Sequence, residues 1–141
     1  MAPGSPSICA LIAARNERPY LQVLLPRLAA QAIDVAILDH GSTDGSLALY
    51  EQLRGAPVVA VAHLADTGVF SLSAQLLAKQ QLAAGLSHSW LVHHDADELL
   101  HHRDGRGNLR HCIEQAAAEG ANAINFEEFV FLPEPGQQQP S

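Results

Sequence analysis

Hydrophobic and polar positions alternate in blocks along this chain. Four short runs predict buried strands, at residues 7–14, 35–39, 57–62 and 90–95; the first three are mainly apolar, and the last, WLVHHD, begins with apolar residues and ends with polar ones. Between them, apolar residues recur at helical spacing and predict helices at residues 19–32, from GSTDGS to Gly55, at 71–84 and at 108–119. Buried strands separated by amphipathic helices are typical of a parallel sheet covered on both faces. The pattern therefore predicts an α/β fold.

Two segments fit this pattern less regularly. Pro26 lies inside the first helical stretch and predicts a kink or an early end of that helix, because proline lacks a backbone N–H. Residues 121–133 are apolar enough to be a candidate fifth strand. The polar ends, residues 1–6 and 133–141, are expected to be flexible and disordered, which leaves one domain at 7–132.

Polar residues follow three of the four expected strands, as AARNE (13–17), LDHGSTDGS (38–46) and HHDADE (93–98). Each is open to a plainer interpretation as a polar loop that caps a helix, and for GSTDGS alone that interpretation is the better one. Ligands of doubly wound sheets bind beyond the carboxyl ends of the strands. Because all three segments would meet at that edge, together they favour a binding site.

Asp95 and Asp97 carry the most specific chemistry in these segments. Side chains two positions apart in an extended chain point the same way, so both carboxylates can face one ligand while Ala96 stays aside. Hard oxygen donors suit Mg²⁺ or Mn²⁺, which proteins hold partly through a bound diphosphate and water. Such an ion would let an acidic protein bind an anionic diphosphate.

Composition narrows the classes of partner. The chain has 141 residues, 48% of them hydrophobic, which is enough for one compact core. The net charge of −7 argues against a nucleic acid or an anionic membrane as the main partner. The start MAPGSPS lacks the basic region of a signal peptide, and no apolar run approaches the roughly 20 residues of a membrane span. We expect a cytoplasmic protein, with Cys9 and Cys112 as buried free thiols.

The segments ICALIAARNE, AILDHGSTDGS and WLVHHDADE, in this order, resemble the three motifs of family 2 glycosyltransferases over about residues 7–130. The resemblance implies the GT-A fold, a Rossmann-like three-layer sandwich with a mainly parallel sheet. It also implies an enzyme that transfers a sugar with inversion from a nucleotide diphosphate donor, usually of UDP or GDP. Mn²⁺ or Mg²⁺ would bind at the DxD motif, and the acceptor would be a sugar, a lipid or a protein.

The resemblance assigns roles to the residues after the first two strands and before the fourth. Ala14, Arg15 and Glu17 match the nucleotide-binding loop after the first strand, and Asp39 matches an acid that helps to hold the base. Lys79 matches a position from which a basic side chain contacts the donor phosphates. The competing interpretation is a solvated lysine on a helix face.

The DxD motif itself is matched by Asp95-Ala96-Asp97, with Asp95 and Ala96 on the nucleotide-sugar, Asp95 nearer to the ribose, and Asp97 as the main metal ligand. Two departures from the family stand out. His40 stands where relatives have a second acid, and the catalytic base of the family would come after Ser141. We therefore expect a truncated, donor-binding portion of a transferase, with an exposed sheet edge that favours homo-oligomers.

Three alternatives remain open. A non-catalytic binding or interaction protein could keep the same fold. A nucleotidyltransferase on a related fold would usually begin with a glycine-rich phosphate loop, whereas AARNERP contains no glycine. His94-Asp95 matches the HD metal pair of phosphohydrolases, but those domains are all helical and this segment has the pattern of a strand.

Overall fold

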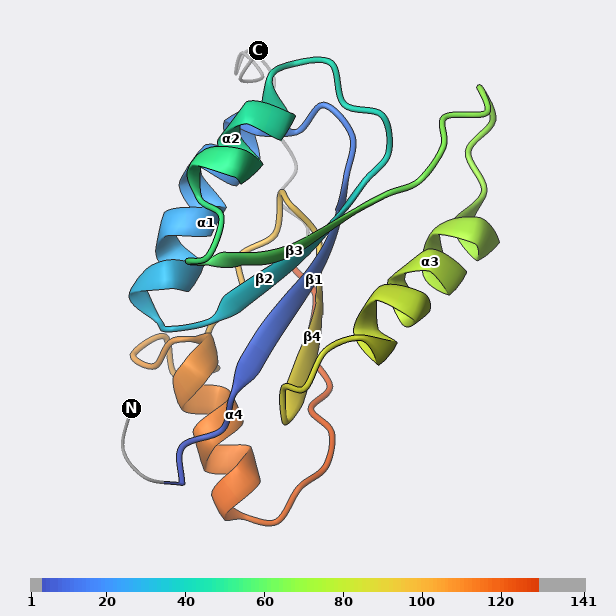
Figure 1. Ribbon diagram of the computed structural model, residues 1–141. Helices are drawn as coiled ribbons and strands as arrows, with labels where there is room; N and C mark the ends of the chain where they lie inside the picture. Colours follow the sequence, from blue (N-terminus) through green and yellow to red (C-terminus); the bar gives the residue numbers. More distant parts are fainter. Residues whose placement is uncertain (1–3, 130–141) are drawn as a thin grey trace.

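A computed structural model describes residues 4–129, which form an α/β fold around one parallel sheet (Figure 1). The strands are β1 (Ile8–Ala14), β2 (Asp34–Asp39), β3 (Val58–His63) and β4 (Trp90–His94). The helices are α1 (Arg18–Ala30), α2 (Ser46–Gln52), α3 (Leu72–Ala84) and α4 (Leu109–Ala118). Within these residues the strand order is β3-β2-β1-β4 and every pairing of neighbouring strands is parallel. The predicted fold class is confirmed.

The central strand, β1, explains why its sequence is an unbroken apolar run. It pairs with β2 on one side and β4 on the other, so that Ile12 lies opposite Ile37 and His94. Its side chains alternate between two cores, with Ile8 in one and Cys9 in the other. A strand that is covered on both faces has no position for a polar side chain.

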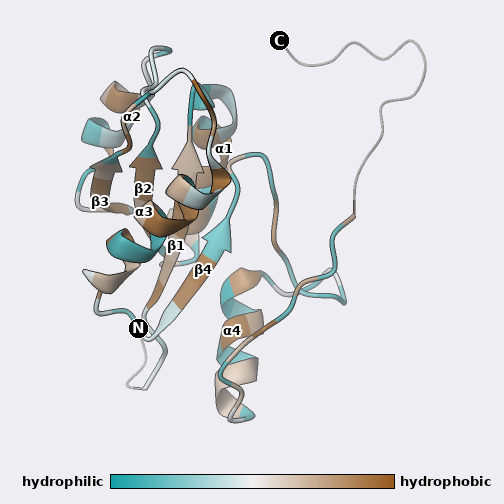
Figure 2. Ribbon diagram, turned by 90° about the vertical axis from the view of Figure 1, so that its right-hand side faces the viewer, coloured by the Kyte–Doolittle hydropathy of each residue, from teal (hydrophilic) through white to brown (hydrophobic). Residues whose placement is uncertain are grey.

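Helices α1, α2 and α4 cover one face of the sheet, and α3 covers the other (Figure 1). The core under α1 is the larger of the two and contains four buried leucines of that helix, Leu21, Leu24, Leu25 and Leu28. Under α3 the buried core is limited to three small or medium side chains, Cys9, Leu11 and Ala36. In Figure 2 the strands are mainly apolar along their length, while β4 becomes polar toward its carboxyl end.

The order of the strands creates a switch point beside β1. The chain moves from β1 outward through β2 to β3, and α3 then carries it back to β4 on the opposite side of β1. The chain leaves β1 toward β2 on one side, while β4 lies on the other side of β1. A crevice therefore opens between the loops that follow β1 and β4. Open α/β sheets bind their ligands there, beyond the carboxyl ends of the strands.

Helix α1 does not end at Pro26, because it continues to Ala30. The carbonyl that loses its partner belongs to Gln22, and both Gln22 and Pro26 are exposed. Water can therefore satisfy that carbonyl, which removes much of the cost of a proline in a helix. The expectation of an early end is wrong.

The expected fifth strand is absent from residues 121–129, and residues 130–133 lie outside the described part. Ile124 and Phe126 instead pack against the larger core as partly buried side chains. Glu127 accepts a hydrogen bond from Arg103 at 2.6 Å. Side-chain contacts, rather than a ladder of backbone hydrogen bonds, therefore hold this segment.

Two further expectations concern the chain ends and the thiols. Residues 1–3 and the expected disordered tail at 133–141 lie outside the described part, whereas Ser5 donates a hydrogen bond to Glu114 of α4 at 2.8 Å. Both cysteines are free, Cys9 buried and Cys112 half-buried. Burial raises the pKa of the Cys9 thiol to about 11. In residues 4–129, helices long and apolar enough to cross a membrane are absent.

Candidate functional site

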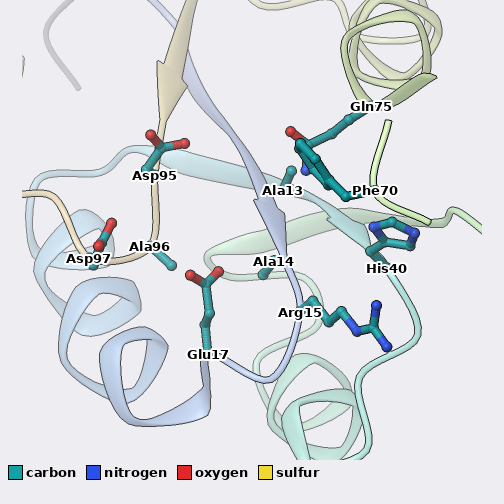
Figure 3. A pocket seen from close by; sticks show the side chains of 10 residues that line it. All are labelled: Ala13, Ala14, Arg15, Glu17, His40, Phe70, Gln75, Asp95, Ala96 and Asp97. Carbon is teal, nitrogen blue, oxygen red and sulfur yellow. The ribbon is translucent and has the colours of Figure 1, made fainter. Parts of the chain in front are cut away.

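A cleft with a volume of about 340 Å³ lies at the carboxyl ends of β1 and β4 (Figure 3). Its walls come from the loops after β1, β2 and β4 and from the start of α3. The lining residues are Ala13, Ala14, Arg15, Glu17, His40, Phe70, Gln75, Asp95, Ala96 and Asp97. Six of the eight residues that the sequence assigned to a site are among them. The other two, Asp39 and Lys79, lie outside this lining.

The loop after β1 is shaped by Asn16, which adopts a left-handed backbone conformation with φ 55°. Asparagine is one of the few residues that enter this region readily. Its amide oxygen accepts a hydrogen bond from Thr43 N at 2.7 Å, and its backbone N–H donates to Ser42 Oγ at 3.1 Å. The loops after β1 and β2 are thereby joined, and Glu17 points toward the segment that follows β4 (Figure 3).

Three carboxylates share one end of the cleft. Asp95 and Asp97 follow β4, and Glu17 approaches them from the start of α1 (Figure 3). Burial raises the pKa of Glu17, and the negative charges of Asp97 and Asp95 raise it further. The folded protein thus concentrates negative charge here at a cost in free energy, and a bound cation would relieve that cost.

The carboxylates fit a divalent ion in chemistry but not as a closed protein cage. Hard oxygen donors are the ligands that Mg²⁺ and Mn²⁺ prefer. Within residues 4–129, however, His, Cys, Asp and Glu side chains form no group of three or more close enough to hold an ion alone. A metal at Asp95 and Asp97 would therefore need further ligands from water or from a bound anion such as a diphosphate.

Arg15 turns away from the carboxylates. Its Nη2 lies 2.6 Å from Oδ2 of Asp66, which belongs to the loop between β3 and α3. Asp66 also accepts a hydrogen bond from Gly68 N at 2.9 Å, and that bond, with the charge of Arg15, lowers the pKa of the Asp66 carboxyl. An exposed pair of this kind contributes little to stability, because solvent screens it. Its effect is to hold the loop that carries Phe70 beside the cleft.

Asp39 has a structural environment. Its side chain is 1% exposed, and Oδ2 accepts a hydrogen bond from Ser42 N at 3.0 Å while Oδ1 lies 3.4 Å from the hydroxyl of Tyr50. These contacts fix the turn after β2. In this arrangement the carboxylate supports the neighbouring loop and does not reach into the cleft.

Lys79 is buried, which excludes its interpretation as a solvated lysine. Only 4% of the residue is exposed, and Nζ lies 3.3 Å from Nδ1 of His93. Burial lowers the pKa of Lys79. His93 in turn places Nε2 3.8 Å from Oδ1 of Asp95, so Lys79 is linked to the cleft through the histidine.

Besides Ala13, three cleft residues did not emerge as site candidates from the sequence. His40 attracted notice only as a departure from the family motif, although it is buried and lines the cleft. Phe70 is 65% exposed in the loop between β3 and α3. An aromatic residue in a stretch that begins with turn residues, DTGVFSL (66–72), could have signalled a binding contact. Gln75 lies in the first turn of α3, where helical periodicity carries no information on ligands.

No protein-family model matches this chain. A search of curated proteins likewise found no match. A functional proposal for this chain is therefore based on the geometry of the cleft and on the motifs that line it.

Proposed function

We propose that this chain binds a nucleotide diphosphate sugar together with Mn²⁺ or Mg²⁺, and that it takes part in inverting transfer of the sugar to an acceptor. The observation that carries the proposal is the meeting of Glu17, Asp95 and Asp97 in one cleft at the switch point between β1 and β4. Ligands of open α/β sheets bind at this position. The cleft volume of about 340 Å³ also falls in the range of small-molecule sites.

The carboxylates account for the metal part of the proposal. Asp97 and Asp95 would supply oxygen ligands, and Glu17 would orient a water molecule or add a further oxygen. The ion would neutralise the charge that develops on the leaving diphosphate. The repulsion that raises the pKa of Glu17 supports this assignment, because an acidic cluster without a cation is unfavourable for folding.

The opposite wall suits the nucleotide. Phe70 is 65% exposed at the edge of the cleft and offers an aromatic face on which a base can stack. Between this wall and the carboxylates, Ala14 and Ala96 are small, so that the backbone ends of β1 and β4 are open to a ribose or phosphate. The amide of Gln75 provides a donor and an acceptor for the edge of a base.

Calorimetric titration of the 141-residue chain tests the proposal. UDP and GDP are each added with Mn²⁺, with Mg²⁺ and with excess chelator. We expect one nucleotide to bind with a measurable heat in the presence of metal, and chelation to weaken that binding by at least about tenfold, equivalent to about 1.4 kcal/mol. Equal binding with and without metal would contradict the role of the carboxylates, and no binding under any condition would contradict the proposal as a whole.

Transfer is tested separately from binding. A donor with a traceable sugar is incubated with the protein and candidate acceptors, and released nucleotide is measured together with labelled product. Labelled product that depends on metal supports a transferase. Metal-dependent binding without release of nucleotide would assign the chain to a binding protein of the same fold.

A further inference from the structure

A second cavity, with a volume of about 450 Å³, lies between α1 and the segment that joins β4 to α4. In Figure 1 this segment loops beside the carboxyl-terminal half of α1. The walls are largely apolar, formed by Leu24 and Leu28 of α1 and by Leu99 and Leu100 of the connecting segment. Leu99 remains 58% exposed, so the cavity is open to solvent on that side.

His94 places a polar atom at the wall of this cavity. The residue is 1% exposed, and its Nδ1 lies 2.7 Å from the carbonyl oxygen of Asp95. A carbonyl oxygen only accepts, so Nδ1 carries the proton and Nε2 of the neutral ring is left with a free lone pair. In residues 4–129 the hydrogen bond made by the His94 ring is the one through Nδ1, which leaves Nε2 available to a ligand.

The charges around the cavity differ in sign from those of the protein as a whole. The chain has a net charge of −7, yet the residues that line this cavity include Arg27 and Arg106 and contain no Asp or Glu. Both arginines are exposed, and in the described part of the chain neither guanidinium forms an ion pair with a carboxylate, although the backbone N–H of Arg106 donates a hydrogen bond to Oδ1 of Asp104 at 2.8 Å. Guanidinium groups that are open to solvent beside an apolar wall favour an anionic ligand.

We propose that this cavity binds an amphipathic hydroxycarboxylate. The apolar chain of the ligand packs against the leucines, its carboxylate pairs with Arg27 and Arg106, and its hydroxyl donates a hydrogen bond to Nε2 of His94. An inorganic anion would leave the leucines uncovered, and a purely apolar ligand would leave Nε2 without a donor. The site is separate from the carboxylate cleft, and the proposal does not rest on nucleotide binding.

The experiment uses ω-hydroxyoctanoate as the probe and protein labelled with ¹⁵N in its histidines. Octanoate lacks the hydroxyl, and octanediol lacks the carboxylate. We expect ω-hydroxyoctanoate to shift the Nε2 resonance of His94, and octanoate to bind without that shift. We expect octanediol to bind about tenfold more weakly than the hydroxy acid, because it cannot form the ion pair near the surface. Octanediol that binds as tightly as the hydroxy acid would overturn the proposal.

A matched pair of variants places the ligand in this cavity. Leu99→Asp introduces a negative charge at the cavity wall, and Leu77→Asp introduces the same charge on α3, on the other face of the sheet. The two leucines are 58% and 56% exposed, so both variants are expected to fold. We expect Leu99→Asp to weaken the probe by about tenfold because of like-charge repulsion, while Leu77→Asp leaves it unchanged. Equal binding by the two variants would overturn the proposal.

Discussion

Nζ of Lys79, a residue of α3, lies 3.3 Å from Nδ1 of His93 in β4. Only 4% of the lysine is exposed. In residues 4–129 this amine forms no ion pair with a carboxylate. The nearest opposing charges, Asp95 and Glu98, raise the pKa of Lys79 less than burial lowers it. The protein therefore holds an amine inside, at the edge of its candidate site, where burial disfavours its charged form.

The stability of the protein should depend on the ionisation of Lys79. Its pKa in the folded state is below the value of 10.5 expected for the unfolded chain, so the folded state loses its proton first as the pH rises. The free energy of unfolding should therefore increase as the pH rises through the folded pKa toward 10.5. We expect Lys79→Met to be more stable than the wild type by about 1 kcal/mol at neutral pH, with the difference shrinking in alkali.

Urea unfolding of both proteins across this pH range measures the effect. The sequence contains a single lysine, so the Nζ resonance in an NMR titration reports its pKa without assignment of other lysines. If the difference in free energy of unfolding between Lys79→Met and the wild type is the same at every pH, the gain in stability comes from packing and not from the charge of Lys79.

Removal of the carboxylate of Asp97 should abolish metal-dependent nucleotide binding and leave the fold intact. Asp97 lines the cleft after the end of β4, so Asp97→Ala removes an oxygen ligand without opening the core. Glu119→Gln is the control, since it removes one negative charge at the end of α4. Calorimetry with Mn²⁺ and nucleotide compares the two, and an Asp97→Ala protein that binds like the wild type would remove the metal role.

Glu17 should cost stability in the absence of a cation. Its raised pKa means that the folded state loses stability as the pH rises from the unfolded value near 4.5 through the folded pKa. We expect Glu17→Gln to raise the free energy of unfolding at neutral pH by less than about 1 kcal/mol, because the side chain is only partly buried, and thereby to raise the thermal midpoint. Mn²⁺ should stabilise the wild type more than the variant. The same gain from Mn²⁺ in both proteins would count against Glu17 as part of the site.

Asp44 should contribute to the packing of two helices. Its Oδ2 accepts a hydrogen bond from Arg18 N at the start of α1 at 2.9 Å, and its Oδ1 accepts from Ser46 N at the start of α2 at 3.0 Å. Partial burial opposes ionisation of Asp44, but the bonds from Ser46 and Arg18 outweigh it and lower the pKa. We expect Asp44→Ala to lower the free energy of unfolding by about 1–2 kcal/mol at neutral pH.

The contribution of Asp44 also has a pH signature. Because its folded pKa is below 3.8, its stabilisation is present above that pH and is lost as the pH falls through the folded pKa. Urea unfolding at neutral and acidic pH therefore measures it. A difference between Asp44→Ala and wild type that persists in strong acid would mean that the side chain acts through packing rather than charge.

Phe70 should contribute to nucleotide affinity by stacking. It is 65% exposed and lines the cleft, so its removal costs the fold little. We expect Phe70→Ala to weaken nucleotide binding by about 1–3 kcal/mol. Phe129→Ala is the matched control, because Phe129 is 75% exposed and does not line the cleft. Equal affinities of the two variants would exclude stacking on Phe70.

The sequence predicted the strands and the helices α3 and α4 closely, but it did not predict the segment after α4. Apolar runs marked β1 and β4 to within one residue, although β1 is covered on both faces and β4 is an edge strand with exposed positions on one face. The same reasoning failed at residues 121–129, where Ile124 and Phe126 bury their side chains without any strand pairing. An apolar pattern indicates that side chains are buried, but it does not indicate whether the backbone of the segment pairs with a neighbouring strand.

The candidate site was predicted in the same partial way. The sequence placed Asp95 and Asp97 after a strand, and parallel strands bring such loops to one edge of the sheet. The position of Asp39 in the motif did not reveal that its carboxylate binds the backbone of the turn after β2. The motifs also did not reveal that Phe70 and Gln75 reach the cleft from the segment around the start of α3. These contacts join residues far apart in the chain, and local periodicity does not encode them.

The sequence by itself determined that apolar strands alternate with amphipathic helices and that acids gather at their ends, because burial and solvation act on each segment locally. Only the tertiary structure decided that Glu17 meets Asp95 and Asp97, and that Lys79 is inside rather than in water. The crossover through α3 brings β4 back beside β1, and it also sets α3 against the sheet. These contacts between residues far apart in the sequence follow from packing, which depends on the whole chain at once.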